Sequence, residues 1–173
     1  PRSEFFNGEA IGAWTRDRVR AVDIVSGCFL LIDTHLWRRL DGFDPRFFMY
    51  GEEADLCLRA ETLGARPVIT PEATIVHFGG ASEKVRADKM VRLLAAKATL
   101  INRHWRRWQR PLGKGLLALW PATRAIATTI GALARPGMVD SAATWRTIWS
   151  RRSEWRDGYP EYARHDADGK CDP

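Results

Sequence analysis

Apolar residues in the first part of the chain follow the pattern of short, buried strands. Residues 22–32 are almost continuously apolar, which predicts a strand buried on both faces of a sheet. Gly27 interrupts this run and indicates a bulge or a close approach of another backbone. Shorter apolar runs over residues 66–70 and 74–77 predict two further strands, whereas the polar residues 1–20 predict an irregular loop.

Apolar positions three and four residues apart predict four helices, over residues 34–40, 53–63, 83–108 and 144–156. The first follows a cap residue, Asp33 or Thr34, and we expect Pro111 to close the third. Residues 115–134 are strongly apolar, but a proline and an arginine interrupt them. We expect this segment to lie on a membrane surface or to pack on the domain, and not to span a bilayer. Residues 157–173 are expected to be frayed.

Charge changes sharply along the chain and separates two parts. Residues 1–83 carry 9 Lys and Arg against 13 Asp and Glu, whereas residues 84–164 carry 17 against 5. We therefore expect an acidic α/β part over residues 1–82, followed by a basic, Trp-rich helical part over residues 83–173. Apolar residues make up 45% of the chain and charged residues 28%, which excludes a disordered protein and a bundle of membrane-spanning helices.

Three carboxylates, Glu52, Glu53 and Asp55, follow directly after an aromatic run, in or just before the first turn of the second predicted helix. Because a helix N-terminus favours negative charge by roughly 0.3–1 kcal/mol, these can be ordinary N-terminal helix acids. The alternative is that one of them is a general base at the edge of a pocket. Both interpretations stay open from spacing alone.

Several other residues that can carry chemistry are expected to be structural. The aromatic side chains of Phe47, Phe48 and Tyr50 should lie mostly in the core. Cys28 and Cys57 stand in apolar runs, which is typical of small buried residues in a reducing compartment. The same structural interpretation applies to the histidines without evident partners in the sequence, His35, His104 and His165.

Four motifs follow one another in the first part of the chain, at residues 25–32, 42–44, 47–59 and 76–80. In this order and spacing they resemble the family 2 glycosyltransferases. The resemblance is closest to the bacterial rhamnosyltransferase-like members that build cell-surface polysaccharides. It is specific over residues 22–82, whereas residues 83–173 are similar only to the variable C-terminal helices of such enzymes.

This resemblance implies a GT-A fold, a Rossmann-like sheet flanked by helices. It also implies transfer of a sugar from a nucleotide-sugar donor to an acceptor hydroxyl, with inversion. Residues 1–82 would be the C-terminal, acceptor-side half of that fold. The chain starts at Pro1 without an initiating Met or a signal-peptide pattern, so we expect it to be an excerpt. The nucleotide-binding half with its Asp-x-Asp metal motif is expected outside it, because Asp166-Ala167-Asp168 lies in the frayed tail.

The resemblance also implies roles on the acceptor side. Glu53 falls on the general base of the family, which is usually an Asp, one methylene shorter. A carboxylate there can accept the hydroxyl proton as the sugar bond forms. Glu52 would bind acceptor hydroxyls or orient the loop, and Asp55 would do the same or cap the helix. Tyr50 would stack on a sugar while its hydroxyl donates a hydrogen bond. The Gly27 segment would line a sugar pocket, or else it is a bulge in a core strand.

On the donor side, the resemblance assigns a metal ligand and a diphosphate site. His77 matches the His of the family's His-x-Gly-Gly segment and would bind a divalent ion, Mn²⁺ or Mg²⁺, together with the Asp-x-Asp motif. The backbone N–H groups of Gly79, Gly80 and Ser82 would lie near the donor diphosphate.

The basic helical part has three interpretations: solvated helix faces, a nucleic-acid surface, or a membrane surface. No recognition motif such as a helix-turn-helix is present, so we do not expect nucleic acid as a partner. Amphipathic helices with Arg on one face and Trp and Leu on the other lie at anionic membrane surfaces. We therefore expect a cytoplasmic protein that is peripheral at the inner face of the cell membrane and acts on a sugar or lipid-linked acceptor.

Two functions without catalysis compete with sugar transfer. A truncated transferase half can serve as a binding module that holds an acceptor or a partner subunit. A membrane-surface adaptor, led by the basic helices, would use the α/β part as a scaffold and would tolerate the loss of all three acids.

Overall fold

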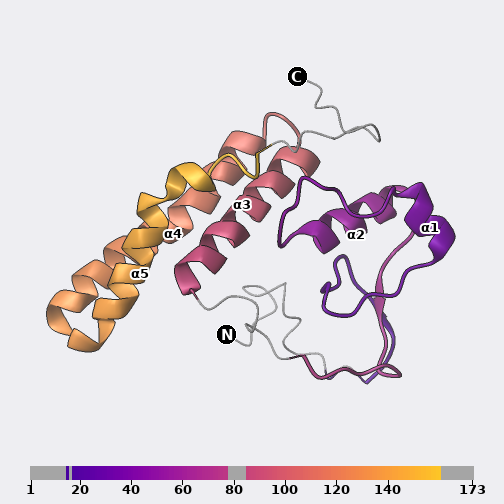
Figure 1. Cartoon of the computed structure of the whole chain (residues 1–173), viewed down its shortest axis with the longest axis horizontal. Coiled ribbons are helices and arrows are strands. Elements are labelled where there is room, and N and C mark those ends of the chain that lie inside the picture. The colour runs from indigo at the N-terminus through magenta and orange to yellow at the C-terminus, as the bar shows by residue number, and fades with distance from the viewer. Residues whose placement is uncertain (1–14, 16, 78–84, 161–173) are drawn as a thin grey trace, which may run out of the picture.

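The computed structural model describes residue 15 and residues 17–77 and 85–160. Residues 17–77 form what we call the first region, and residues 85–160 form the helical region. In Figure 1 the helices of the helical region lie side by side, and the first region lies at one side of them. The elements of the first region are β1 (Arg20–Ala21), α1 (Thr34–Arg39), α2 (Glu52–Thr62) and β2 (Val68–Ile69). Those of the helical region are α3 (Arg86–His104), α4 (Arg110–Ala134), η1 (Pro136–Met138), α5 (Val139–Ser150) and η2 (Arg152–Glu154).

Each region has its own buried cluster of apolar side chains. The cluster of the first region is small and joins α1 to α2 through Leu40, Leu56 and Ala60. The cluster of the helical region is larger and draws on all three long helices; it contains Val91, Leu94, Ala95, Ala125, Trp145, Ile148 and Trp155. The indole N–H of Trp155 also donates a hydrogen bond to the Ile148 carbonyl, 3.0 Å away. Most of the buried apolar volume therefore belongs to the helical region.

The two predicted helices of the first region are confirmed within one or two residues. α1 begins at Thr34, and the Asp33 side chain accepts a hydrogen bond from the Leu36 N–H at 2.9 Å, as expected for a cap. α2 begins at Glu52, so the acids do stand in its first turn. Local signals decide both helices, which explains why the sequence predicts them.

The prediction of one helix over residues 83–108 is wrong at its end. α3 ends at His104, and α4 starts at Arg110 with Pro111 in its first turn. Proline suits the first turn of a helix because the N–H that it lacks would have no partner there. Pro111 therefore begins a helix here and does not close one.

The predicted strands are mostly absent. β1 and β2 form a two-residue antiparallel ladder, with Arg20 opposite Ile69 and Ala21 opposite Val68. Residues 22–32 and 74–77 form no strand, and Leu31 is 82% exposed. A strand buried on both faces needs neighbouring strands and covering layers, and the described residues supply neither along this run. The partial GT-A sheet stays a prediction, because two residue pairs are too few to identify it.

Two residues expected in the core lie at the surface. Phe48 is 71% exposed, with the Arg92 guanidinium 5.5 Å above its ring. Its neighbour Phe47 is buried, so only one of these two aromatic side chains joins the core. Cys28 is exposed because it stands in a turn, whereas Cys57 on α2 is buried as expected.

Tyr159 ties the last described residues to both regions, which contradicts the frayed end expected from residue 157 onward. Its N–H donates to the Thr99 hydroxyl at 2.8 Å, and the single proton of its hydroxyl is shared between the carbonyls of Met49 and Arg92. Residues 161–173 lie outside the described part of the chain.

α4 packs on the bundle with one face only. Gly113, Pro121 and Ala125 are its buried residues, and Ala125 joins the cluster shared with α3 and α5. Arg124 lies between two indole rings, 5.2 Å from that of Trp120 and 5.4 Å from that of Trp145. Among the residues that the structure describes, α4 alone is long and apolar enough to cross a membrane, judged by length and composition. The prediction that residues 115–134 pack on the domain is confirmed for this face.

Candidate functional site

The turn before α2 determines where Glu52 and Glu53 lie. Tyr50 and Gly51 both have left-handed backbone conformations, with φ of +68° and +85°. Such a φ is uncommon for a tyrosine and easy for a glycine. A Cβ on Gly51 would also lie 3.3 Å from the Cβ of Ala96 on α3. The chain therefore reverses tightly against α3, and Glu52 and Glu53 come directly after the reversal.

Asp55 anchors this end of α2. Its side chain is fully buried, and it pairs with three cationic or potentially cationic side chains. Arg59 Nε lies 2.7 Å from Oδ2, and Arg103 Nε and His104 Nε2 lie 2.5 and 2.8 Å from Oδ1. These groups take the place of the acceptor hydroxyls that the sequence analysis assigned to Asp55. His104, for which no partner was expected, therefore has a defined one.

The same arginines fasten the loop that precedes the site. Arg59 donates hydrogen bonds to the carbonyls of Leu40 and Gly42, at 2.5 and 2.8 Å. Arg103 pairs with Asp44 at 3.0 Å. One cluster of charged groups thus holds the loop, α2 and the end of α3 in a fixed relation, and the positions of Glu52 and Glu53 depend on it.

Glu52 and Glu53 each present a buried carboxylate oxygen that lacks a partner. Within the described part of the chain, the Oε2 atoms of both side chains are shielded from solvent and have no hydrogen-bond partner. Leaving a buried polar group unpaired costs about 1–3 kcal/mol, and more for a charged group. Unpartnered buried oxygens of this kind, here on two consecutive residues, are positions where a hydroxyl can donate a hydrogen bond.

Burial also changes the acidity of this site. It raises the pKa of the Glu52 carboxyl, and the neighbouring charge of Glu53 adds to the rise, while a backbone hydrogen bond opposes it. Burial likewise raises the pKa of the Cys57 thiol, one turn further along α2, and Glu53 contributes there too. Cys57 is thus a neutral thiol and not a reactive thiolate.

The segment around Gly27 lies directly against Glu53. A Cβ built on Gly27 would meet Glu53 Cβ at 3.5 Å and its Cδ at 3.8 Å. Because residues 22–32 form no strand, Gly27 is not a bulge in a core strand. The bulge in a core strand is therefore excluded, and the interpretation that this segment lines a sugar pocket stays a prediction.

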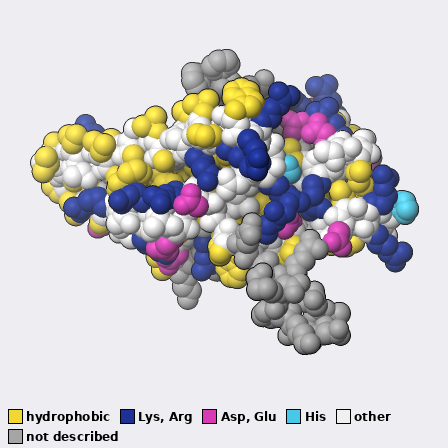
Figure 2. All heavy atoms as spheres, turned by 90° about the horizontal axis from the view of Figure 1, so that it is seen from above, with side chains coloured by type: hydrophobic (Ala, Val, Ile, Leu, Met, Phe, Trp, Pro, Cys, Tyr) yellow, Lys and Arg dark blue, Asp and Glu magenta, His cyan; other side chains and the backbone are white. Residues whose placement is uncertain are grey.

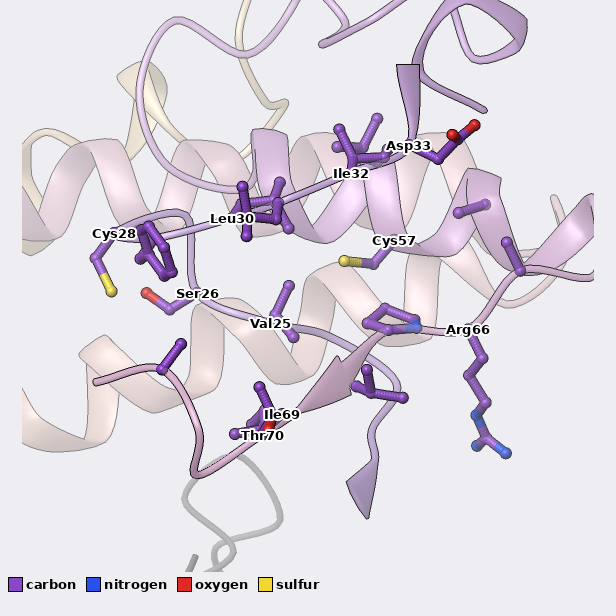
Figure 3. Close-up of a pocket in the computed structure, with 18 of the residues that line it drawn as sticks. Val25, Ser26, Cys28, Leu30, Ile32, Asp33, Cys57, Arg66, Ile69 and Thr70 are labelled. Atoms are coloured by element: carbon purple, nitrogen blue, oxygen red, sulfur yellow. The ribbon is translucent and has the colours of Figure 1, made fainter. Parts of the chain in front are cut away.

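An open apolar pocket of about 600 Å³ lies on the side of α2 that carries Leu56, Cys57 and Ala60. Its walls come from the segment 25–33, from α2 and from residues 65–75. In Figure 3 the Cys57 thiol points into it from α2, while the Arg66 side chain extends away from it. Cys57, one turn after Glu53 on α2, lines the pocket, and the apolar lining suits an apolar group.

The remaining predicted site residues are not brought together. Tyr50 is half-buried next to the acids, whereas His77 is exposed. Over the described residues, no three His, Cys, Asp or Glu side chains come close enough to hold a metal ion. His77 alone does not make the predicted metal centre, and the residues expected at the diphosphate, Gly79, Gly80 and Ser82, lie outside the described residues.

Comparison with known proteins finds relatives that are sugar transferases. The chain is 33% identical over 94 residues to the rhamnosyltransferase WbbL of Escherichia coli K12, which covers 50% of this chain and 36% of that protein. It is 36% identical over 107 residues to the N-acetylglucosaminyl-diphospho-decaprenol L-rhamnosyltransferase of Mycobacterium tuberculosis, which covers 58% of this chain and 34% of that protein. No family model matches the chain, and no solved structure does.

The match is partial in length on both sides. The chain spans about a third of the length of the curated relatives it matches. Two relatives from distant bacteria nevertheless share its sequence at similar identity, and both are named as rhamnosyltransferases. The chain is therefore related in sequence to rhamnosyltransferases, and through them to the glycosyltransferases in general.

Proposed function

We propose that this chain supplies the acceptor side of an inverting glycosyltransferase that moves a sugar from a nucleotide-sugar donor to a hydroxyl of a lipid-linked acceptor. The observation that carries the proposal is the pair of buried, unpartnered carboxylate oxygens on Glu52 and Glu53. The names of the relatives support the reaction class, and that of the Mycobacterium tuberculosis protein supports a lipid-linked acceptor.

In this proposal Glu53 is the general base. The acceptor oxygen attacks the anomeric carbon of the donor sugar and gives its proton to Glu53 Oε2. As the new bond forms, the bond from that carbon to the diphosphate oxygen breaks on the opposite face, and the diphosphate leaves with the bonding electrons. Attack from the face opposite the leaving group inverts the anomeric centre. A positioned base of this kind contributes about 10²–10⁴-fold to the rate.

The other residues of the site bind or position. Glu52 Oε2 accepts a hydrogen bond from a second acceptor hydroxyl, and the half-buried Tyr50 offers its ring to the acceptor sugar. Asp55 holds α2 through Arg59 and Arg103, so we give it a positioning role. The apolar pocket beside Cys57 would take an apolar part of the acceptor.

The divalent metal implied by the family resemblance has only one of its expected ligands here. His77 is exposed and stands without other ligands among the described residues, so the residues present do not fit a metal site by themselves. No step of the proposed reaction is routed through a metal ion.

Substitution of Glu53 tests the proposal. We expect Glu53→Gln to lower the transfer of labelled rhamnose, supplied in nucleotide-linked form to membranes of the protein's own cells, by at least about 100-fold. Glu61→Gln is the matched control, because Glu61 is an exposed acid on the same helix. The control should transfer at the rate of the unmodified protein.

The competing functions give a different result. A non-catalytic binding module and a membrane-surface adaptor both predict that Glu53→Gln leaves transfer unchanged. Near-normal transfer by Glu53→Gln, with folding confirmed by circular dichroism, would remove Glu53 from the role of base.

A further inference from the structure

α4 carries a continuous row of exposed apolar side chains. Their spacing of three or four residues, with Thr123 filling the middle position, keeps them on one side of the helix from its first turn to its last. Six large side chains of this row are each 56–87% exposed: Leu112, Leu116, Leu119, Ile126, Ile130 and Leu133. We call these six residues the α4 row.

The α4 row faces away from the protein. The buried residues of α4, including Pro121 and Ala125, stand on the other side of the helix, toward α3 and α5. Only three of the 25 residues of α4 are buried, so α4 is not an enclosed core helix. Figure 2 shows hydrophobic side chains spread over the projecting end of the molecule, with Lys and Arg beside them. A patch of this length on a soluble surface indicates a binding face.

The helical region that carries the α4 row is strongly positive. Residues 85–160 contain 15 Lys and Arg against 4 Asp and Glu, a net charge of +11. α4 itself contains no acid. Trp105 and Trp108, 43% and 71% exposed, stand just before it, next to Arg106 and Arg107. Exposed indoles beside arginines are typical of segments that lie at the boundary between headgroups and acyl chains.

We propose that α4 lies along the surface of an anionic lipid bilayer, with the α4 row inserted among the acyl chains and the surrounding arginines on the lipid phosphates. This inference stands independently of the proposed catalytic role. A second copy of the chain is the less suitable occupant, because it would bring together two helical regions of net charge +11, and α4 offers no acid for pairing. A spanning α4 is also disfavoured, because α5 packs along it and would carry Asp140 and Arg146 into the bilayer.

Vesicle flotation of the full 173-residue chain tests this binding face. We expect at least tenfold stronger binding to vesicles of phosphatidylcholine with 30% phosphatidylglycerol than to pure phosphatidylcholine. Raising the salt from 0.1 to 0.5 M should weaken that binding. The double substitution Ile126→Glu, Ile130→Glu should lower it at least tenfold. Val76→Glu is the matched control, since Val76 is 80% exposed but lies in the first region, and it should bind as the unmodified chain does.

Three results would overturn the proposal, provided circular dichroism shows unchanged helix content in the variants. The first is equal binding to both vesicle types, or none. The second is a dimer by light scattering that the double substitution converts to a monomer without vesicle binding, which would assign the α4 row to a second copy. The third is binding that resists carbonate extraction at pH 11, which would indicate a spanning helix.

Discussion

The helical region has a larger buried core than the first region, although both regions also expose large apolar side chains. Leu94, Ile148 and Trp155 of the helical region are each at most 1% exposed, whereas Ile24, Phe29 and Leu31 of the first region are 47–82% exposed. A helix closes its backbone hydrogen bonds within one segment, so three helices suffice to build a core. An apolar strand depends on neighbours from elsewhere. Beyond Val22, whose N–H donates to the Pro67 carbonyl, the run 22–32 forms no strand pairing among the described residues.

The candidate site belongs to the first region but is held by the helical one. Arg103 and His104 at the end of α3 pair with Asp55, and Tyr159 donates a hydrogen bond to the Met49 carbonyl just before the acids. The comparison of the two regions therefore predicts that damage to the helical region spreads to the site, whereas damage to the exposed part of the first region does not.

The largest expected effect is at the centre of the helical core. Trp155→Ala removes a 1%-exposed indole and its hydrogen bond to Ile148, and it should lower the free energy of unfolding by about 4 kcal/mol. Urea unfolding followed by circular dichroism measures this change. Leu31→Ala, at an 82%-exposed apolar position in the first region, should cost no more than about 0.5 kcal/mol. Equal losses from both substitutions would contradict the comparison.

A smaller but still large effect is expected where the two regions meet. Asp55→Asn leaves Arg59, Arg103 and His104 without their buried carboxylate and should lower the free energy of unfolding by about 3 kcal/mol. The matched control is Asp23→Asn, because the Asp23–Arg66 pair is exposed, at 73% and 58%, and is worth less than about 1 kcal/mol. If the two substitutions cost the same in urea unfolding, Asp55 does not join the regions.

The smallest expected change in the free energy of unfolding is at Glu52, and it is a gain where the two preceding substitutions cause a loss. Because burial raises the pKa of Glu52, folding favours its neutral form, and its charge at pH 7 is destabilising. The contribution of neutral Glu52 to the free energy of unfolding is present at low pH and is lost as the pH rises through the folded-state pKa. Glu52→Gln should therefore stabilise the protein at pH 7, by about 0.5 kcal/mol after allowance for solvent screening. Thermal unfolding should show this gain shrinking as the pH falls and the Glu52 carboxyl becomes neutral. A gain that grows at low pH would contradict this assignment.

The predictions that the structure confirms depend on residues that are close together in the sequence. The cap at Asp33 and the placing of Glu52 and Glu53 in the first turn of α2 depend on residues within one turn of each other. The ion pair of Asp55 with Arg59 was also accessible in principle, since residues four apart on a helix are neighbours. The partner His104 was not, because 49 positions separate it from Asp55 and nothing in the sequence joins them.

The rest of the fold could not be read from periodicity. A continuous apolar run predicts burial, but it does not name the surface that buries it, and residues 25–32 line an open pocket where a sheet was expected. Pro111 shows a second ambiguity, because the same residue can follow one helix or begin the next. The expected metal centre also depends on more than His77, and no sequence spacing within the described residues supplies the other ligands.

The claim that Glu53 accepts the acceptor proton is tested most directly by comparing transfer rates of Glu53→Asp and Glu53→Gln at saturating donor and acceptor. Both substitutions keep a polar side chain, but only Glu53→Asp keeps a carboxylate. The account predicts that Glu53→Asp stays within about tenfold of the unmodified protein, while Glu53→Gln falls by at least about 100-fold. Equal rates for the two variants would contradict a role in proton transfer and would leave Glu53 as a structural acid of the helix N-terminus.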